Sequence, residues 1–244
     1  MNRFRFALGP LLACGIPAIA VFAGSTVLAP DLAAQEADTL PRVFPVDEAD
    51  ENPGFFAFRA RLLRASAERD TAALLAVVDS TIKLSFGGSA GIEDFRREWL
   101  DSPENDIWVE LGAALSLGGR FWNDSSFYAP YTFHPFAGRE EPPGYDPYGS
   151  LIVVDDAVPV LSAPRPRRAE ETGADTLAVL SFAVVSHEWR TSVADPPAGW
   201  TAIRLADGPL GFVESRFVRS PNDYRAIFTR RGTEWRMTIF IAGD

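Results

Sequence analysis

Cysteine and histidine are nearly absent from this chain of 244 residues, which contains only Cys14, His134 and His187 of these two types. A single cysteine excludes a disulfide framework within the chain. Zinc sites take several His, Cys or carboxylate ligands at short spacings, and neither histidine has a partner at such a spacing. We therefore expect no metal site and no cofactor.

Signatures of catalysis are also missing. Cysteine peptidases and transpeptidases need a thiolate beside a histidine, and the only thiol lies in the N-terminal apolar segment. The chain has no Gly-x-Ser-x-Gly elbow to support a serine triad. Carboxylates on expected helices read as solvated charges, so we assign no catalytic residue. These carboxylates are Glu93, Asp94, Glu98 and Glu110.

Positive charge is scarce as well, with 23 Lys and Arg against 33 Asp and Glu and a formal net charge of -10. Binding to a phosphate backbone needs a concentrated positive surface, so we expect no nucleic-acid partner. An anionic envelope polymer would also be repelled unless a divalent cation bridged the two or the basic cluster at residues 165–168 made a local exception.

Charge is absent from Phe6 to Pro30, directly after Arg3 and Arg5. A positive start followed by an apolar stretch predicts a secretory signal over residues 1–34, with cleavage after the small residue Ala34. A retained anchor and lipidation at Cys14, which ends a lipobox-like run, are the alternatives. The expected location is periplasmic or extracellular, with membrane contact only through an uncleaved signal.

Residues 35–52 are rich in acidic side chains and contain one arginine, Arg42, and two prolines, Pro41 and Pro45. Such a segment buries too little apolar area to offset the entropy of ordering it. It is predicted to be a disordered acidic tether.

Residues 53–155 predict a helix-rich α+β domain. Apolar residues at helical spacing favour helices at 55–69, 71–78 and 92–99, and Asp70 is placed to cap the second. Alternation of Ile82, Leu84 and Phe86 with polar residues predicts a strand. Ser102 before Pro103 predicts the start of a further helix that ends at residues 118–119.

The segment from residue 121 to 148 has no periodicity but holds nine aromatic residues. These rings either cover the helical core and the domain junction, or form an exposed stacking surface for a sugar ring or a peptide. The binding candidates from this segment are Trp122, Tyr128 and Tyr131. The nine aromatic residues are Phe121, Trp122, Phe127, Tyr128, Tyr131, Phe133, Phe136, Tyr145 and Tyr148.

Residues 156–220 carry short strand-like runs separated by a long loop and tight glycine turns, which favours a small closed barrel. The pattern is an opening Val-x-Val before a proline, a Gly-Trp entering a strand, then Asp-Gly and Gly-aromatic-Val. It resembles the bacterial SH3-like domain family, although the opening lacks the family's usual arginine. The residues are Val158, Val160, Pro164, Gly199, Trp200, Asp207, Gly208, Gly211, Phe212 and Val213.

The resemblance implies an envelope setting, because family members are commonly found in exported proteins, where they bind cell-wall peptides or accompany an enzyme. Peptidoglycan or an envelope protein is therefore an expected partner. Trp200 is the binding candidate from this region, either lining a groove or packed in the barrel core.

Alternating apolar residues from Tyr224 to Ile241 around Arg231-Gly232 predict a terminal β-hairpin within residues 221–244. An isolated hairpin is marginal in water, so we expect it to return to the strand at residues 81–86. The barrel would then be an insertion. Residues 67–99 with this hairpin have a general resemblance to the nuclear-transport-factor-like cone fold.

Two functional classes remain open for this α+β chain. The first is a non-enzymatic envelope protein that binds a wall peptide, a glycan or a protein. The second is a small-molecule binder or carboxylate-dependent enzyme on the cone-like part, with a pocket lined by Phe86, Trp99 and some of the aromatic residues between 121 and 148.

Overall fold

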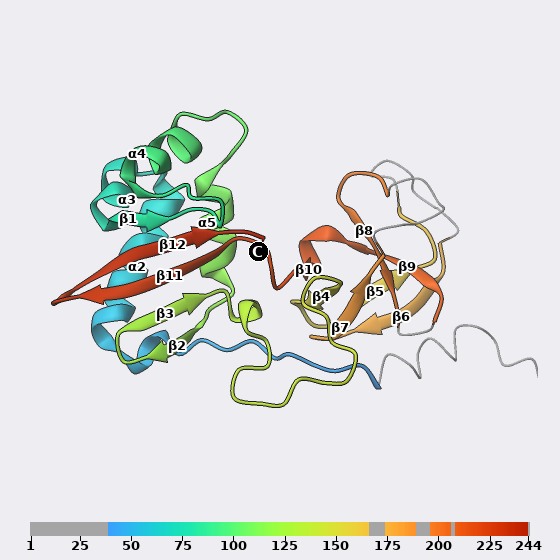
Figure 1. Cartoon of the computed structure of the whole chain (residues 1–244). Helices are drawn as coiled ribbons and strands as arrows, with labels where there is room; N and C mark the ends of the chain where they lie inside the picture. The colour runs from blue at the N-terminus through green and yellow to red at the C-terminus, as the bar shows by residue number, and fades with distance from the viewer. Residues whose placement is uncertain (1–38, 166–173, 189–195, 206–207, 244) are drawn as a thin grey trace, which may run out of the picture.

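The computed structural model describes residues 39–165, 174–188, 196–205 and 208–243, and its fold is α+β with two mostly antiparallel sheets (Figure 1). The predicted signal at residues 1–34 lies outside the described residues. Within the part that is described, no helix has both the length and the apolar character needed to cross a membrane.

The first sheet combines strands from both ends of the described chain. Its spatial order is β1 (Val78–Lys83), β12 (Glu234–Ile241), β11 (Arg225–Arg231), β3 (Ser126–Ala129) and β2 (Arg120–Asn123). The terminal hairpin β11–β12 therefore lies in the middle, with β12 parallel to β1 and β11 antiparallel to β3. The hairpin therefore connects β1 on one side with β3 on the other into one sheet.

The second sheet lies in sequence between β3 and β11 (Figure 1). All its pairings are antiparallel, and the apolar side chains of six of its strands form one core. Its order is β10 (Val218–Arg219), β4 (Ser150–Val153), β7 (Val184–His187), β8 (Trp200–Arg204), β9 (Leu210–Glu214), β5 (Val158–Leu161) and β6 (Thr176–Leu180).

The sheet begins at Ser150, earlier than the expected boundary at residue 156. Strand β4 belongs to this sheet because it is buried along its whole length and pairs with both β7 and β10.

Helices α2 (Pro53–Glu68) and α3 (Thr71–Val77) match their predicted positions closely. The Asn52 side chain accepts a hydrogen bond from the Phe55 amide at 3.0 Å, and Pro53 occupies the first helical position, where its missing N–H costs nothing. Asp70 caps α3 by accepting from the Ala73 amide at 3.0 Å, as predicted.

The later helix does not begin at Ser102, so that prediction is wrong. Helix α5 (Ile107–Ser116) begins after Asp106, whose side chain accepts from the Trp108 amide at 3.0 Å. The Ser102 hydroxyl instead accepts from the Glu104 amide in a turn. Both residues are capping types, and the carboxylate of Asp106 is the one that meets the free amides.

Two shorter elements precede α5. Helix α4 (Gly91–Phe95) runs into the π-helical turn η2 (Arg96–Leu100), and together they bury Phe95 and Trp99. The alternation expected through Phe86 ends early, because β1 stops at Lys83 and Phe86 is 52% exposed.

The predicted disordered tether is wrong for residues 39–52, which are ordered against both sheets. Val43 is buried, and its amide donates to the Phe182 carbonyl at 2.8 Å. Glu48 accepts from the Phe121 amide at 2.8 Å and lies 3.3 Å from the Arg120 guanidinium. The Glu48 carboxylate is therefore held by specific donors, a compensation that composition does not reveal.

The aromatic segment is also more regular than predicted at its start. Residues 120–129 form the hairpin β2–β3, and the 3-10 turn η3 (Tyr131–Phe133) follows. Phe127 is fully buried in the first core, whereas Tyr131 and Phe136 pack with Ile152 in a smaller cluster beside the second sheet. Much of the segment serves packing, one of the two roles foreseen.

Phe55 on α2 is the centre of the first core. Its ring lies 4.2 Å from the ring of Phe127, 4.9 Å from Trp235, 5.6 Å from Phe121 and 5.7 Å from Phe228. These partners come from β2, β3, β11 and β12, so one side chain joins the helix to four strands.

We predict that Phe55→Ala lowers the free energy of unfolding by about 3–5 kcal/mol, because it removes a ring from a filled core. The neighbouring Phe56 is 55% exposed, and Phe56→Ala should change it by less than about 0.5 kcal/mol. Urea denaturation of the two variants measures the difference. Equal effects would contradict the packing described.

A second prediction concerns the ordered segment before α2. Val43→Ala should lower the free energy of unfolding by about 2 kcal/mol, because two buried methyl groups are lost and a cavity is left. The exposed Asp50 supplies the control, Asp50→Ala. A Val43→Ala protein as stable as this control would mean that residues 39–52 are a tether after all.

Candidate functional site

The four predicted binding residues lie in different environments. Trp122 on β2 is 59% exposed, whereas Tyr128 on β3 and Tyr131 in η3 are only 3% and 2% exposed. Trp200 begins β8 in the second sheet, is half-buried, and donates through Nε1 to the Arg165 carbonyl at 3.1 Å. Tyr128 and Tyr131 are therefore packing residues, and Trp122 alone offers an open ring.

Trp122 is held in place by two neighbouring rings. It makes edge-to-face contacts with Tyr128 at 5.9 Å and with His134 at 4.8 Å between ring centroids. The His134 ring in turn lies 4.1 Å from Phe133. The buried Tyr128 thus restricts the exposed Trp122 side chain. Little side-chain entropy remains to be lost when a ligand stacks on Trp122.

A cleft of about 340 Å³ opens beside His134, so the same imidazole contacts Trp122 and lines the cleft. Its walls are mostly rings and prolines, and one cation and one anion, Arg139 and Glu141, are among its lining residues. The lining residues are Phe133, His134, Pro135, Phe136, Ala137, Arg139, Glu141, Tyr145, Pro147, Pro221 and Asn222.

Four buried polar side-chain atoms of this region lack a hydrogen-bond partner among the described residues. They are the Tyr128 and Tyr131 hydroxyls, Thr132 Oγ1 and His134 Nε2. Burial raises the pKa of Tyr131 to about 12. Burial, and secondarily the Arg225 charge, lower the pKa of His134. A neutral imidazole carries no charge, which suits an uncharged ligand.

Trp99 and Phe86, two of the residues proposed to line an enzyme pocket, differ in their exposure to solvent. Trp99 is buried, packed 4.9 Å from the rings of Tyr224 and Phe240. Phe86 is exposed, with the Lys83 ammonium 4.5 Å from its ring.

Three of the carboxylates expected to be solvated are half-buried, and two of them, Asp94 and Glu98, accept from the Ser89 hydroxyl. Glu110 on α5 is half-buried, and its pKa is raised chiefly by burial, although the nearby Arg219 charge acts in the opposite direction. Glu110 is not among the residues that line the cleft beside His134.

The described residues contain no group of three or more His, Cys, Asp or Glu side chains arranged to hold a metal ion. Comparison of the chain with protein-family models, with curated proteins and with solved structures finds no match. The function of the surface around Trp122 and His134 therefore has to be inferred from its own geometry and charge.

The low pKa of His134 predicts a pH effect. As the pH falls, the unfolded chain takes up the His134 proton near pH 6.5, whereas the folded chain takes it up only at a lower pH. The contribution of neutral His134 to the free energy of unfolding is therefore complete above pH 6.5 and is lost as the pH falls toward the pKa of the folded state. NMR titration of the imidazole should give a midpoint below 6.5.

Unfolding measurements between pH 8 and pH 5 supply the second readout. His134→Gln should flatten the decline of stability below pH 6.5. His187→Gln should act in the same direction, because burial also lowers the pKa of His187. A midpoint for His134 at or above 6.5 would contradict its burial.

Proposed function

We propose that the chain is an exported, non-enzymatic binding protein of the cell envelope that holds a glycan or a wall peptide on Trp122 and in the adjoining cleft. The observation that carries this proposal is a tryptophan that is 59% exposed yet packed against two rings, one of which, His134, also lines a cleft of about 340 Å³. Exposure of a large apolar ring to water is unfavourable, and such a ring is available for stacking against a ligand.

The chemistry of the surface favours a ligand with apolar faces and uncharged polar groups. Trp122 offers one flat ring, Phe136 and Tyr145 supply further ring surface in the cleft, and Pro147 and Pro221 are rigid. Sugar rings and peptide side chains both present such faces. Rigid aromatic anchors bind at low entropic cost, which is how a small surface reaches useful affinity.

The net charge of -10 bears on which envelope ligand fits. A strongly anionic polymer is repelled by the field of the whole chain, whereas a neutral glycan strand or a short peptide is not. The neutral state of His134, favoured by its burial, adds no positive charge to attract an anion. We therefore place the ligand among uncharged glycans and wall peptides.

The proposal includes the fold of the two parts. We take the second sheet to be an SH3-like barrel. Its support is that Leu151 of β4, near one end of the strand order, shares a core with Leu180 of β6 at the other end. We take the first part to be cone-like and completed by the terminal hairpin. Its support is the packing of α2, α3 and α5 side chains with those of β11 and β12 in one core.

The test is retention of the purified protein on isolated sacculi and on envelope extract. Trp122→Ala should weaken binding by about 2 kcal/mol or more, roughly thirtyfold, as expected for a central aromatic anchor. Phe56→Ala removes an equally exposed ring from α2 and should leave retention unchanged.

Thermal unfolding of both variants serves as the control for folding, and both should remain folded because each ring is more than half exposed. Retention of Trp122→Ala at the level of the unchanged chain would remove Trp122 from the binding surface. Failure of the unchanged chain to bind either preparation would refute the proposed function.

A further inference from the structure

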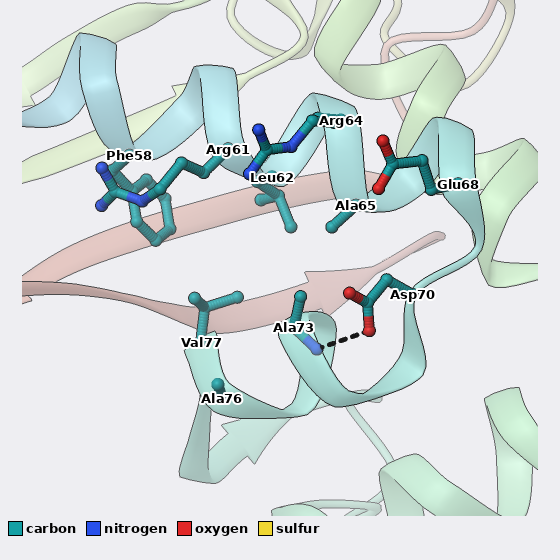
Figure 2. A pocket seen from close by; sticks show the side chains of 10 residues that line it. All are labelled: Phe58, Arg61, Leu62, Arg64, Ala65, Glu68, Asp70, Ala73, Ala76 and Val77. Atoms are coloured by element: carbon teal, nitrogen blue, oxygen red, sulfur yellow. Dashed lines mark hydrogen bonds between the residues drawn. The ribbon is translucent and has the colours of Figure 1, made fainter.

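A groove lies between α2 and α3 (Figure 2), and none of its lining residues belongs to the cleft beside His134. It encloses about 250 Å³. Buried Phe58, Leu62 and Ala65 of α2 form one side, and small residues of α3, among them Ala73 and Val77, form the other.

The groove continues past the end of α3. A second recess of about 280 Å³ shares Phe58, Arg61, Ala76 and Val77 with the first and extends to Trp235 and Gly54. Along α2 the two recesses run from Gly54 to Glu68, about 21 Å at 1.5 Å per residue. An extended peptide of about six residues spans that length.

The charges along the groove are separated. Arg61 and Arg64 have no hydrogen bond or ion pair among the described residues, and Figure 2 shows both guanidinium groups turned toward the Phe58 end. Glu68 and Asp70 lie at the opposite end, where Asp70 also caps α3. In the second recess the Arg236 charge is already matched by Glu234.

We propose that this groove binds an extended segment of a partner protein that has small apolar side chains, carboxylates at one end and a basic group at the other. The apolar side chains lie between α2 and α3. The carboxylates meet Arg61 and Arg64, and the basic group meets Glu68 and Asp70. The two charged ends fix the direction of the bound segment, because the reversed orientation places like charges together.

A membrane surface is the other class of ligand with apolar and anionic character. The chain carries a net charge of -10, which opposes approach to an extended anionic surface. A short acidic segment that enters the groove meets the two arginines at close range, inside the screening length of about 8 Å at physiological salt. The charge distribution therefore favours a peptide.

The probe is a random heptapeptide library displayed on phage and selected on the purified protein. Selected sequences should combine small apolar residues with acidic residues at one end. A synthetic peptide of the selected consensus should bind Arg61→Glu/Arg64→Glu about tenfold more weakly or worse in fluorescence anisotropy. Arg96→Glu/Arg230→Glu changes the net charge equally at exposed positions outside the groove and should bind within about twofold.

A third variant tests the direction of binding. Selection on Glu68→Lys should no longer favour a basic residue at the end of the peptide away from the carboxylates. Trp122→Ala should leave peptide binding unchanged, so this site and the sugar or wall-peptide surface stand or fall separately.

Circular dichroism should show all variants folded, since the changed residues are exposed. The proposal is overturned if no sequence is enriched over the Arg61→Glu/Arg64→Glu protein, or if the enriched sequences bind both double variants alike. It is also overturned if the chain selects no peptide but sediments with phosphatidylglycerol vesicles through Arg61 and Arg64.

Discussion

The packing of Phe55 against rings from β2, β3, β11 and β12 sets the position of α2 on the first sheet. Phe58 and Leu62 follow on the same face and are buried with it. Because a helix has 3.6 residues per turn, fixing these three side chains also fixes where Arg61 and Arg64 emerge. The groove against α3 and its unpaired positive charge are therefore consequences of the same aromatic core.

The same core explains why the second sheet is carried as an insertion. The chain leaves the first sheet after Ala129 and returns at Arg225, yet β3 and β11 are paired neighbours. The chain therefore leaves for the second sheet and returns from it at the same end of the β3–β11 strand pair. The segment after β3 contributes Tyr131 and Phe136 to a cluster with Val43 and Ile152, which packs this segment and the chain before α2 against the second sheet. Trp122 on β2 contacts His134 of the segment that follows β3, so the outgoing chain passes the hairpin β2–β3 at this point.

Local patterns in the sequence predicted part of this fold. The apolar spacing of α2 and the cap at Asp70 are short-range signals, and both predicted their elements well. Long-range partners decided the rest. Acidic residues 39–52 are ordered because Glu48 finds donors on Arg120 and Phe121, far along the chain. Likewise, Tyr128 and Tyr131 belong to an aromatic-rich segment whichever way they point, and only the fold determines that they are buried while Trp122 is exposed.

Charge acts at two distances in this protein, and the difference limits its ligands. Beyond about 8 Å at physiological salt, a ligand responds mainly to the net charge of -10, and a large anionic polymer gains nothing by approaching. Within that distance it meets individual groups, such as Arg61 and Arg64 with no partner among the described residues, or the His134 imidazole, whose burial favours its neutral form. A small or flexible ligand reaches these groups without confronting the whole field. The two proposed surfaces therefore suit short segments and uncharged rings, and neither suits an extended polyanion.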